Sequence, residues 1–149
     1  MKNILAVLLI TTFITGCQAG GNSGQGENTT QPLQISNKAE LNQQISDQAD
    51  QALQNENNLT DVQAVNDEKQ LLIAAQVPHN ERFQLKKIEK ELTKQAEEQF
   101  SDYDVTLSLD KKIHLEVMKL KKRLAEGKVD KKKLSKEIEN LIKLSKEKT

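Results

Sequence analysis

The sequence has few of the residues on which cofactor sites and disulfide frameworks are built. Its 149 residues include one cysteine, no tryptophan, one tyrosine and three phenylalanines. A single cysteine excludes an intramolecular disulfide and a cysteine-rich metal site, and so few rings leave little for base stacking or an aromatic cofactor cage. Hydrophobic residues make up 36% of the chain and charged residues 30%, so the core is expected to be small and mostly aliphatic.

A long hydrophobic run is also lacking, because the apolar stretch at residues 4–14 is too short to span a bilayer comfortably. A stable transmembrane helix needs about 20 residues. The stretch follows a short basic start and precedes Thr15-Gly16-Cys17, which is the order of parts in a secretory signal peptide. An ordinary secretory signal with an incidental cysteine is one interpretation.

The other interpretation rests on Ile14-Thr15-Gly16-Cys17, which resembles the lipobox of bacterial lipoprotein signals. The resemblance implies that the Cys17 thiol receives a diacylglyceryl group and that the chain is cut just before it. Two acyl chains hold a protein firmly at a membrane, whereas one is marginal. We therefore expect a lipoprotein signal peptide at 1–16, and a lipidated Cys17 with a flexible, glycine-rich tether at 17–35.

Beyond the tether, hydrophobic periodicity predicts a small α+β domain over residues 36–110. Apolar residues three and four apart predict helices over about 37–54, capped by Ser36, and about 81–101. Alternating residues predict strands over about 60–66, 70–77 and 103–109, the second apolar on both faces like a central strand. The order α-β-β-α-β predicts a three-stranded sheet with both helices on one face, similar in topology to the BON domain.

Two more helices are predicted in a basic tail over residues 111–149. Asp110 and Asp130 are expected to cap helices over about 111–126 and 131–147, with Gly127 as the stop between them. These helices are expected to form an antiparallel hairpin or one bent arm. The open face of the sheet is left for this tail or for a partner.

The zero net charge of the chain hides a strong asymmetry. Residues 111–149 contain 14 Lys/Arg and 6 Asp/Glu, whereas residues 1–110 contain 8 and 16. The lysine clusters of the tail are solvated faces of amphipathic helices, or they contact anionic lipid or an acidic envelope polymer, where each lysine contributes about 1 kcal/mol. Export and the lack of stacking aromatics argue against nucleic acid. The candidate contact residues are Lys121, Lys122, Arg123, Lys131, Lys132 and Lys133.

No pattern in the sequence predicts a catalytic site. His79 and His114 are the only histidines, and zinc-protease spacing, a nucleophile elbow and a phosphate-binding glycine loop are all missing. Asp102, Asp104 and Asp110 cluster around the third predicted strand, and paired acids can hydrolyse glycosides, but surface and capping roles are commoner. We expect no enzyme, no cofactor and no metal, with a metal site at His79 as a minor alternative.

The chain resembles the YhcN/YlaJ family of sporulation lipoproteins from spore-forming Firmicutes. The resemblance is carried by the lipobox, the polar tether, the strands at 59–65 and 71–77, and Tyr103-Asp-Val-Thr-Leu-Ser-Leu-Asp110 before a basic helix. It covers roughly residues 36–145. It implies a membrane lipoprotein of the inner spore membrane that acts in sporulation, germination or outgrowth, with no established enzymatic activity.

These observations together favour a non-enzymatic lipoprotein on the extracytoplasmic face of the cell membrane. Its partners are expected to be the membrane, through the anchor, and an anionic lipid or an envelope protein. The alternative is a general cell-envelope binding or assembly lipoprotein that has no link to spores.

Overall fold

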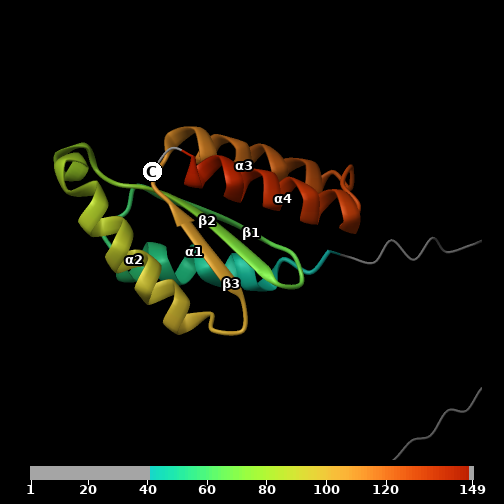
Figure 1. Ribbon diagram of the computed structural model, residues 1–149, viewed down its shortest axis with the longest axis horizontal. Helices are drawn as coiled ribbons and strands as arrows, with labels where there is room; N and C mark the ends of the chain where they lie inside the picture. The colour runs from blue at the N-terminus through green and yellow to red at the C-terminus, as the bar shows by residue number, and fades with distance from the viewer. Residues whose placement is uncertain (1–40, 148–149) are drawn as a thin grey trace, which may run out of the picture. The chain divides into compact units, whose positions relative to one another are not determined.

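The computed structural model describes residues 41–147, which fold around one small sheet (Figure 1). The predicted signal peptide, Cys17, the tether and the Ser36 cap lie outside the described residues. The elements, in chain order, are helix α1 (Gln44–Glu56), strands β1 (Asp61–Asn66) and β2 (Gln70–Gln76), the 3-10 helix η1 (His79–Gln84), helix α2 (Leu85–Gln99), strand β3 (Asp104–Ser108), and helices α3 (Lys111–Ala125) and α4 (Lys131–Lys146).

The three strands form a mixed sheet in the order β1-β2-β3. β1 and β2 are antiparallel, with Asn66 opposite Leu71, and β2 and β3 are parallel, with Gln70 opposite Asp104. A parallel pair needs a crossover connection, which η1 and α2 supply. The predicted α-β-β-α-β order and the central position of the second strand are confirmed.

The turn between β1 and β2 is built around the side chain of Asp67. Its Oδ1 accepts hydrogen bonds from the backbone N–H groups of Lys69 and Gln70, each at 2.8 Å. Burial by itself would raise the pKa of Asp67, but these two N–H groups and the Ser135 hydroxyl lower it below its usual value. Asp67 therefore stabilises the hairpin most where it is ionised, above the pKa of the unfolded chain.

Strand β2 is buried on both faces, and each face has its own core. Leu71, Ile73 and Ala75 pack with α1 and α2 through Ala49, Leu53, Leu92 and Ala96. Leu72 and Ala74 pack with α3 and α4 on the opposite face, through Ile113, Val117, Leu120, Leu134, Ile138 and Ile142. The predicted placement of the first two helices on one face is confirmed, and the open face is covered by the chain's own tail.

The tail is an antiparallel hairpin with the predicted ends (Figure 1). The Asp110 carboxylate accepts from the N–H groups of Lys112 and Ile113 at 2.8 and 3.0 Å, and Asp130 accepts from Lys133 at 2.9 Å. Gly127, between the helices, has a φ of 65°, a conformation that glycine adopts without steric cost. Of the two predicted arrangements, hairpin and bent arm, the structure shows the hairpin.

The predicted start of the first helix is wrong, because residues 41–43 are not helical and α1 begins at Gln44. The cap comes from a distant residue. Asn66 of β1 is buried, and its Oδ1 accepts from the backbone N–H of Ser46 at 3.1 Å. Gln43 is also held by β1, because its side-chain amide donates to the Asn66 carbonyl at 2.7 Å. A tertiary contact therefore sets the beginning of α1.

The second helix also differs from the prediction. Residues 79–84 form the 3-10 helix η1, and the α-helix proper runs only over Leu85–Gln99. η1 has no buried residue, so no apolar stripe holds it in the α-helical period.

Because α3 and α4 form a core with one face of β2, a residue buried in that core is expected to contribute as much to the free energy of unfolding as one in an ordinary domain core. Leu72 is fully buried against α3 and α4, whereas Leu115 on the outer side of α3 is 44% exposed. We expect Leu72→Ala to lower the free energy of unfolding by about 2–5 kcal/mol and Leu115→Ala by about 0.5 kcal/mol or less. Urea unfolding followed by circular dichroism measures both, and equal small losses would show that the tail is not part of the core.

Candidate functional site

The fold turns the charge asymmetry of the sequence into two unlike layers. Helices α3 and α4 lie on one side of the sheet, and α1 and α2 lie on the other (Figure 1). Helices α3 and α4 themselves carry 12 Lys/Arg and 3 Glu, whereas helices α1 and α2 together carry 4 Lys and 7 Asp/Glu. The basic α3–α4 layer, meaning residues 111–146, is therefore the candidate functional surface.

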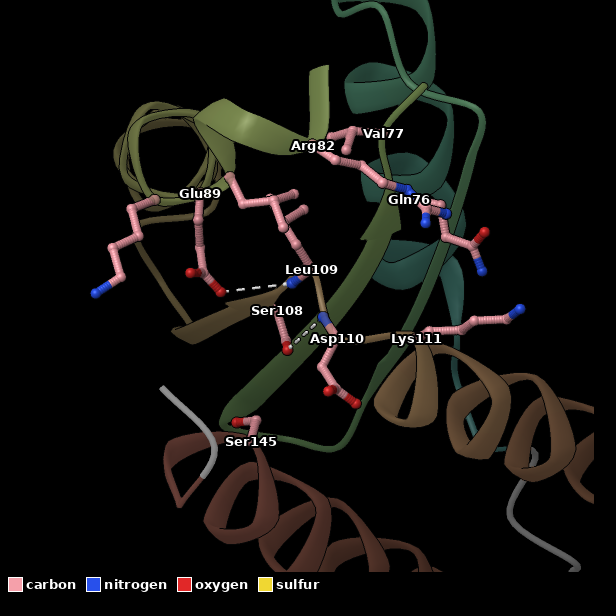
Figure 2. A pocket seen from close by; sticks show the side chains of 11 residues that line it. Gln76, Val77, Arg82, Glu89, Ser108, Leu109, Asp110, Lys111 and Ser145 are labelled. Carbon is pink, nitrogen blue, oxygen red and sulfur yellow. Dashed lines mark hydrogen bonds between the residues drawn. The ribbon is translucent and has the colours of Figure 1, made fainter. Parts of the chain in front are cut away.

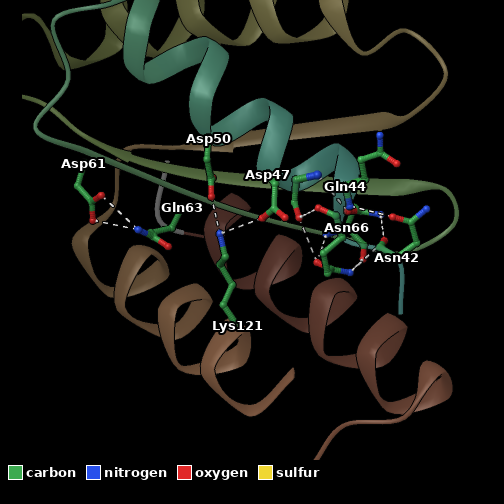
Figure 3. A network of polar contacts seen from close by, with 10 residues as sticks. Asn42, Gln44, Asp47, Asp50, Asp61, Gln63, Asn66 and Lys121 are labelled. Carbon is green, nitrogen blue, oxygen red and sulfur yellow. Dashed lines mark hydrogen bonds and ion pairs between the residues drawn. The ribbon is translucent and has the colours of Figure 1, made fainter. Parts of the chain in front are cut away.

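Three of the six predicted contact residues are bound within the protein. Lys121 forms an ion pair with Asp50 of α1 (Figure 3). The Arg123 guanidinium binds both carboxylate oxygens of Glu137 on α4, with Nη1 3.0 Å from Oε1. Lys131 pairs with Glu68 in the β1–β2 turn. These side chains tie the hairpin together and to the rest of the fold. Their contact with an anionic surface stays a prediction.

The other three predicted residues are exposed. Lys122, Lys132 and Lys133 make no ion pair with another residue of the described range 41–147. Sequence reasoning missed further lysines of the same kind because it looked at runs of adjacent charges and not at the outer face of each helix. Within helices α3 and α4, the additional exposed lysines without an ion pair to a described residue are Lys111, Lys112, Lys136, Lys143 and Lys146.

The pair of Lys121 and Asp50 joins helices that lie on opposite faces of the sheet, beside the edge strand β1 (Figure 3). The side chains are only 26% and 21% exposed, and Asp47 lies 4.0 Å from the same ammonium group. Burial raises the pKa of Asp50 above its usual value, although Lys121 and the Ala64 backbone N–H oppose this. The lysine thus stabilises a carboxylate that burial disfavours.

His114 is a second polar link between α3 and the sheet. The ring is 2% exposed, with Nε2 2.8 Å from Asp61 Oδ2 on β1 and Nδ1 3.0 Å from Gln76 Nε2 on β2. An amide nitrogen can only donate, so Nδ1 accepts a hydrogen bond from Gln76. The proton of the neutral ring is then on Nε2, which donates a hydrogen bond to Asp61. Both ring nitrogens are bound to protein groups, which makes His114 a structural residue. Its place beside Ile113 on the buried stripe was the signal for this role.

The acids around the third strand do not form a catalytic group. Asp104 begins β3 and Asp110 follows its end, so at about 3.3 Å per residue their backbones are roughly 20 Å apart. Asp102 and Asp104 are exposed, and Asp110 caps α3. His79 is exposed at the start of η1. Within residues 41–147, no three His, Cys, Asp or Glu side chains are placed to hold a metal ion.

An open pocket of about 370 Å³ lies at the carboxyl ends of β2 and β3 (Figure 2). Glu89 accepts a hydrogen bond from the Leu109 backbone N–H at 3.4 Å, and Ser108 Oγ accepts from the Asp110 N–H at 3.2 Å. The second carboxylate of the pocket, that of Asp110, accepts from the N–H groups of Lys112 and Ile113, so both carboxylates are bound to backbone N–H groups. The pocket is lined by Gln76, Val77, Arg82, Leu85, Lys86, Glu89, Ser108, Leu109, Asp110, Lys111 and Ser145.

Comparison with known proteins found no family model, no curated protein and no solved structure that matches this chain. The resemblance to the YhcN/YlaJ family therefore stays a prediction. None of the helices described between residues 41 and 147 is both long and apolar enough to cross a membrane.

The two neighbouring lysines 121 and 122 provide a matched test of these contacts. We expect Lys121→Ala to lower the free energy of unfolding by about 1–3 kcal/mol, because a buried carboxylate loses its partner, and Lys122→Ala to change it by about 0.5 kcal/mol or less. Denaturant unfolding of both variants at pH 7 measures the difference.

The effect of Lys121→Ala is also expected to depend on pH. Without the ammonium group, the folded-state pKa of Asp50, already above its unfolded value of 3.8, rises further. Stability then falls as pH rises from below 3.8 through that raised pKa, so the loss relative to wild type is larger at pH 7 than at pH 3. A loss that is independent of pH would contradict this account of the pair.

Proposed function

We propose that the protein is a non-enzymatic, lipid-anchored lipoprotein of the spore or cell envelope. It acts in sporulation, germination or outgrowth by binding a protein or the membrane surface. The observation that carries this proposal is the pairing of a predicted lipid anchor at Cys17 with a fold whose positive charge is concentrated in one layer. An anchored body with one basic layer is suited to holding a preferred face toward an anionic surface.

The contacts of the polar groups support a binding role. The groups that most resemble catalytic ones are used inside the fold: His114 is bound through both nitrogens, and Asp110 caps α3. The lysines left exposed in the α3–α4 layer are flexible cations of the kind that contact anionic groups as point charges.

The place of action follows from the same proposal. The anchor puts the folded domain on the extracytoplasmic face of the cell membrane, and the family resemblance favours the inner spore membrane. A general envelope lipoprotein without a link to spores is the alternative. Production restricted to sporulating cells favours the first, whereas equal amounts throughout growth favour the second.

Lipidation of Cys17 is the step that the proposal needs first. We expect the full chain made in its natural host to start at a modified Cys17, to enter the detergent phase of a Triton X-114 separation, and to stay with membranes washed in high salt. Cys17→Ser should remain uncut and lack the added lipid mass, because the acceptor thiol is gone. Mass spectrometry of the intact protein measures both, and an unmodified Cys17 thiol in the wild-type protein would refute the proposal.

A further inference from the structure

Helix α3 carries two large apolar side chains on its solvent side. Leu115 is 44% exposed and Met118 is 43% exposed, and with Phe83 of η1 they are the exposed large hydrophobic residues of the described chain. The opposite side of α3 packs on the sheet, where Ile113, Val117 and Leu120 are fully buried. Leu115 and Met118 are therefore not part of either core.

Lysines surround these two residues at helical spacing. Residues three and four apart lie next to one another on a helix surface, so Lys111 and Lys112 lie one turn before Leu115. Lys119 and Lys122 lie one turn after Leu115 and Met118. All four lysines are exposed, and only Lys119 has an ion pair among the described residues, with Glu116 at 2.8 Å. We call these six residues the α3 outer face: Lys111, Lys112, Leu115, Met118, Lys119 and Lys122.

We propose that the α3 outer face lies on an anionic lipid bilayer. Leu115 and Met118 enter the headgroup region, and the surrounding lysines place their ammonium groups at the lipid phosphates. This combination of an apolar centre and a lysine rim is typical of helices that lie in the membrane interface, because lysine can bury its alkyl stem and keep its charge in water. The inference rests on the proposed function, which puts the folded domain at a membrane.

The charge of the whole fold supports this orientation. Helix α4 shares the layer and adds Lys132, Lys133, Lys136, Lys143 and Lys146 to the field that attracts anionic lipid. Helix α1, across the sheet, has Asp47, Asp50 and Glu56 and no lysine or arginine. A bilayer of negative charge therefore attracts the α3–α4 layer and repels α1, and α3 is the helix of the attracted layer that exposes large apolar side chains.

A dye placed in the α3 outer face tests the proposal directly. The full chain with Leu115→Cys is labelled with an environment-sensitive dye and reconstituted through its own anchor into vesicles of phosphatidylcholine with 30% phosphatidylglycerol. The matched position is Gln48→Cys on α1, which is exposed on the other layer. The wild-type chain, whose Cys17 thiol is used by the anchor, is treated with the same dye and gives the background from non-specific labelling. We expect a blue shift and quenching by lipid-borne quenchers at 115 but not at 48, and loss of both in pure phosphatidylcholine or at 0.5 M salt.

Two double charge-reversal variants of equal net charge, one on α3 and one on α2, separate the role of the α3 outer face from that of the net charge. Lys112→Glu with Lys122→Glu should lower the equilibrium constant for lipid contact of the dye at 115 at least roughly 30-fold, from the contribution of two lysines at an anionic surface. The control is Lys90→Glu with Lys94→Glu on α2, which changes the net charge by the same amount. It should change the equilibrium constant for lipid contact of the dye at 115 by less than about threefold. Unchanged circular dichroism and thermal midpoints show that each variant is folded.

The outcomes separate this inference from the proposed function. If the protein floats with the vesicles and the dye at 115 stays in water, the α3 outer face does not contact lipid and the inference is overturned, while the anchor stands. If the dye at 115 is buried only after a second protein is added, the face binds protein and the inference is likewise overturned. If the chain does not float with the vesicles at all, the anchor itself fails and the inference falls with it.

Discussion

The central strand β2 has apolar side chains on both faces, and the rest of the structure depends on this constraint. Leu71, Ile73 and Ala75 point to one side and Leu72 and Ala74 to the other, and all are fully buried. Apolar surface on both faces of a sheet is stable only when both are covered. Helices α1 and α2 cover one face, so the fold is complete only when α3 and α4 cover the second.

This requirement explains how a basic segment becomes an integral layer. The hairpin must present an apolar stripe to β2, and its lysines are thereby restricted to the outer sides and edges of the two helices. At the edges they find acids: Lys121 binds Asp50 of α1 and Lys131 binds Glu68 of the β1–β2 turn. On the outer side of α3, Lys119 pairs with Glu116 of the same helix. Lys111, Lys112 and Lys122 have no ion pair among the described residues, which leaves their positive charge available for an anionic surface.

The features that local sequence determines were predicted correctly. Asp110, Gly127 and Asp130 act within a few residues of their own positions, and the strand order follows from alternation and from the doubly apolar β2. The start of α1 could not be predicted, because its cap comes from Asn66, twenty residues away in sequence. For the same reason, runs of charge identified the basic region but could not show that Lys121 and Arg123 bind Asp50 and Glu137 while Lys111 and Lys112 stay exposed.

Native-state hydrogen exchange tests most directly whether the second face of β2 makes α3 and α4 part of one cooperative fold. The account predicts that amides of Leu72, Leu120 and Ile138 exchange through the same global opening, with equal free energies and equal dependence on denaturant. Exchange of the α3 and α4 amides through a separate opening of low free energy, while the β2 amides stay protected, would contradict it.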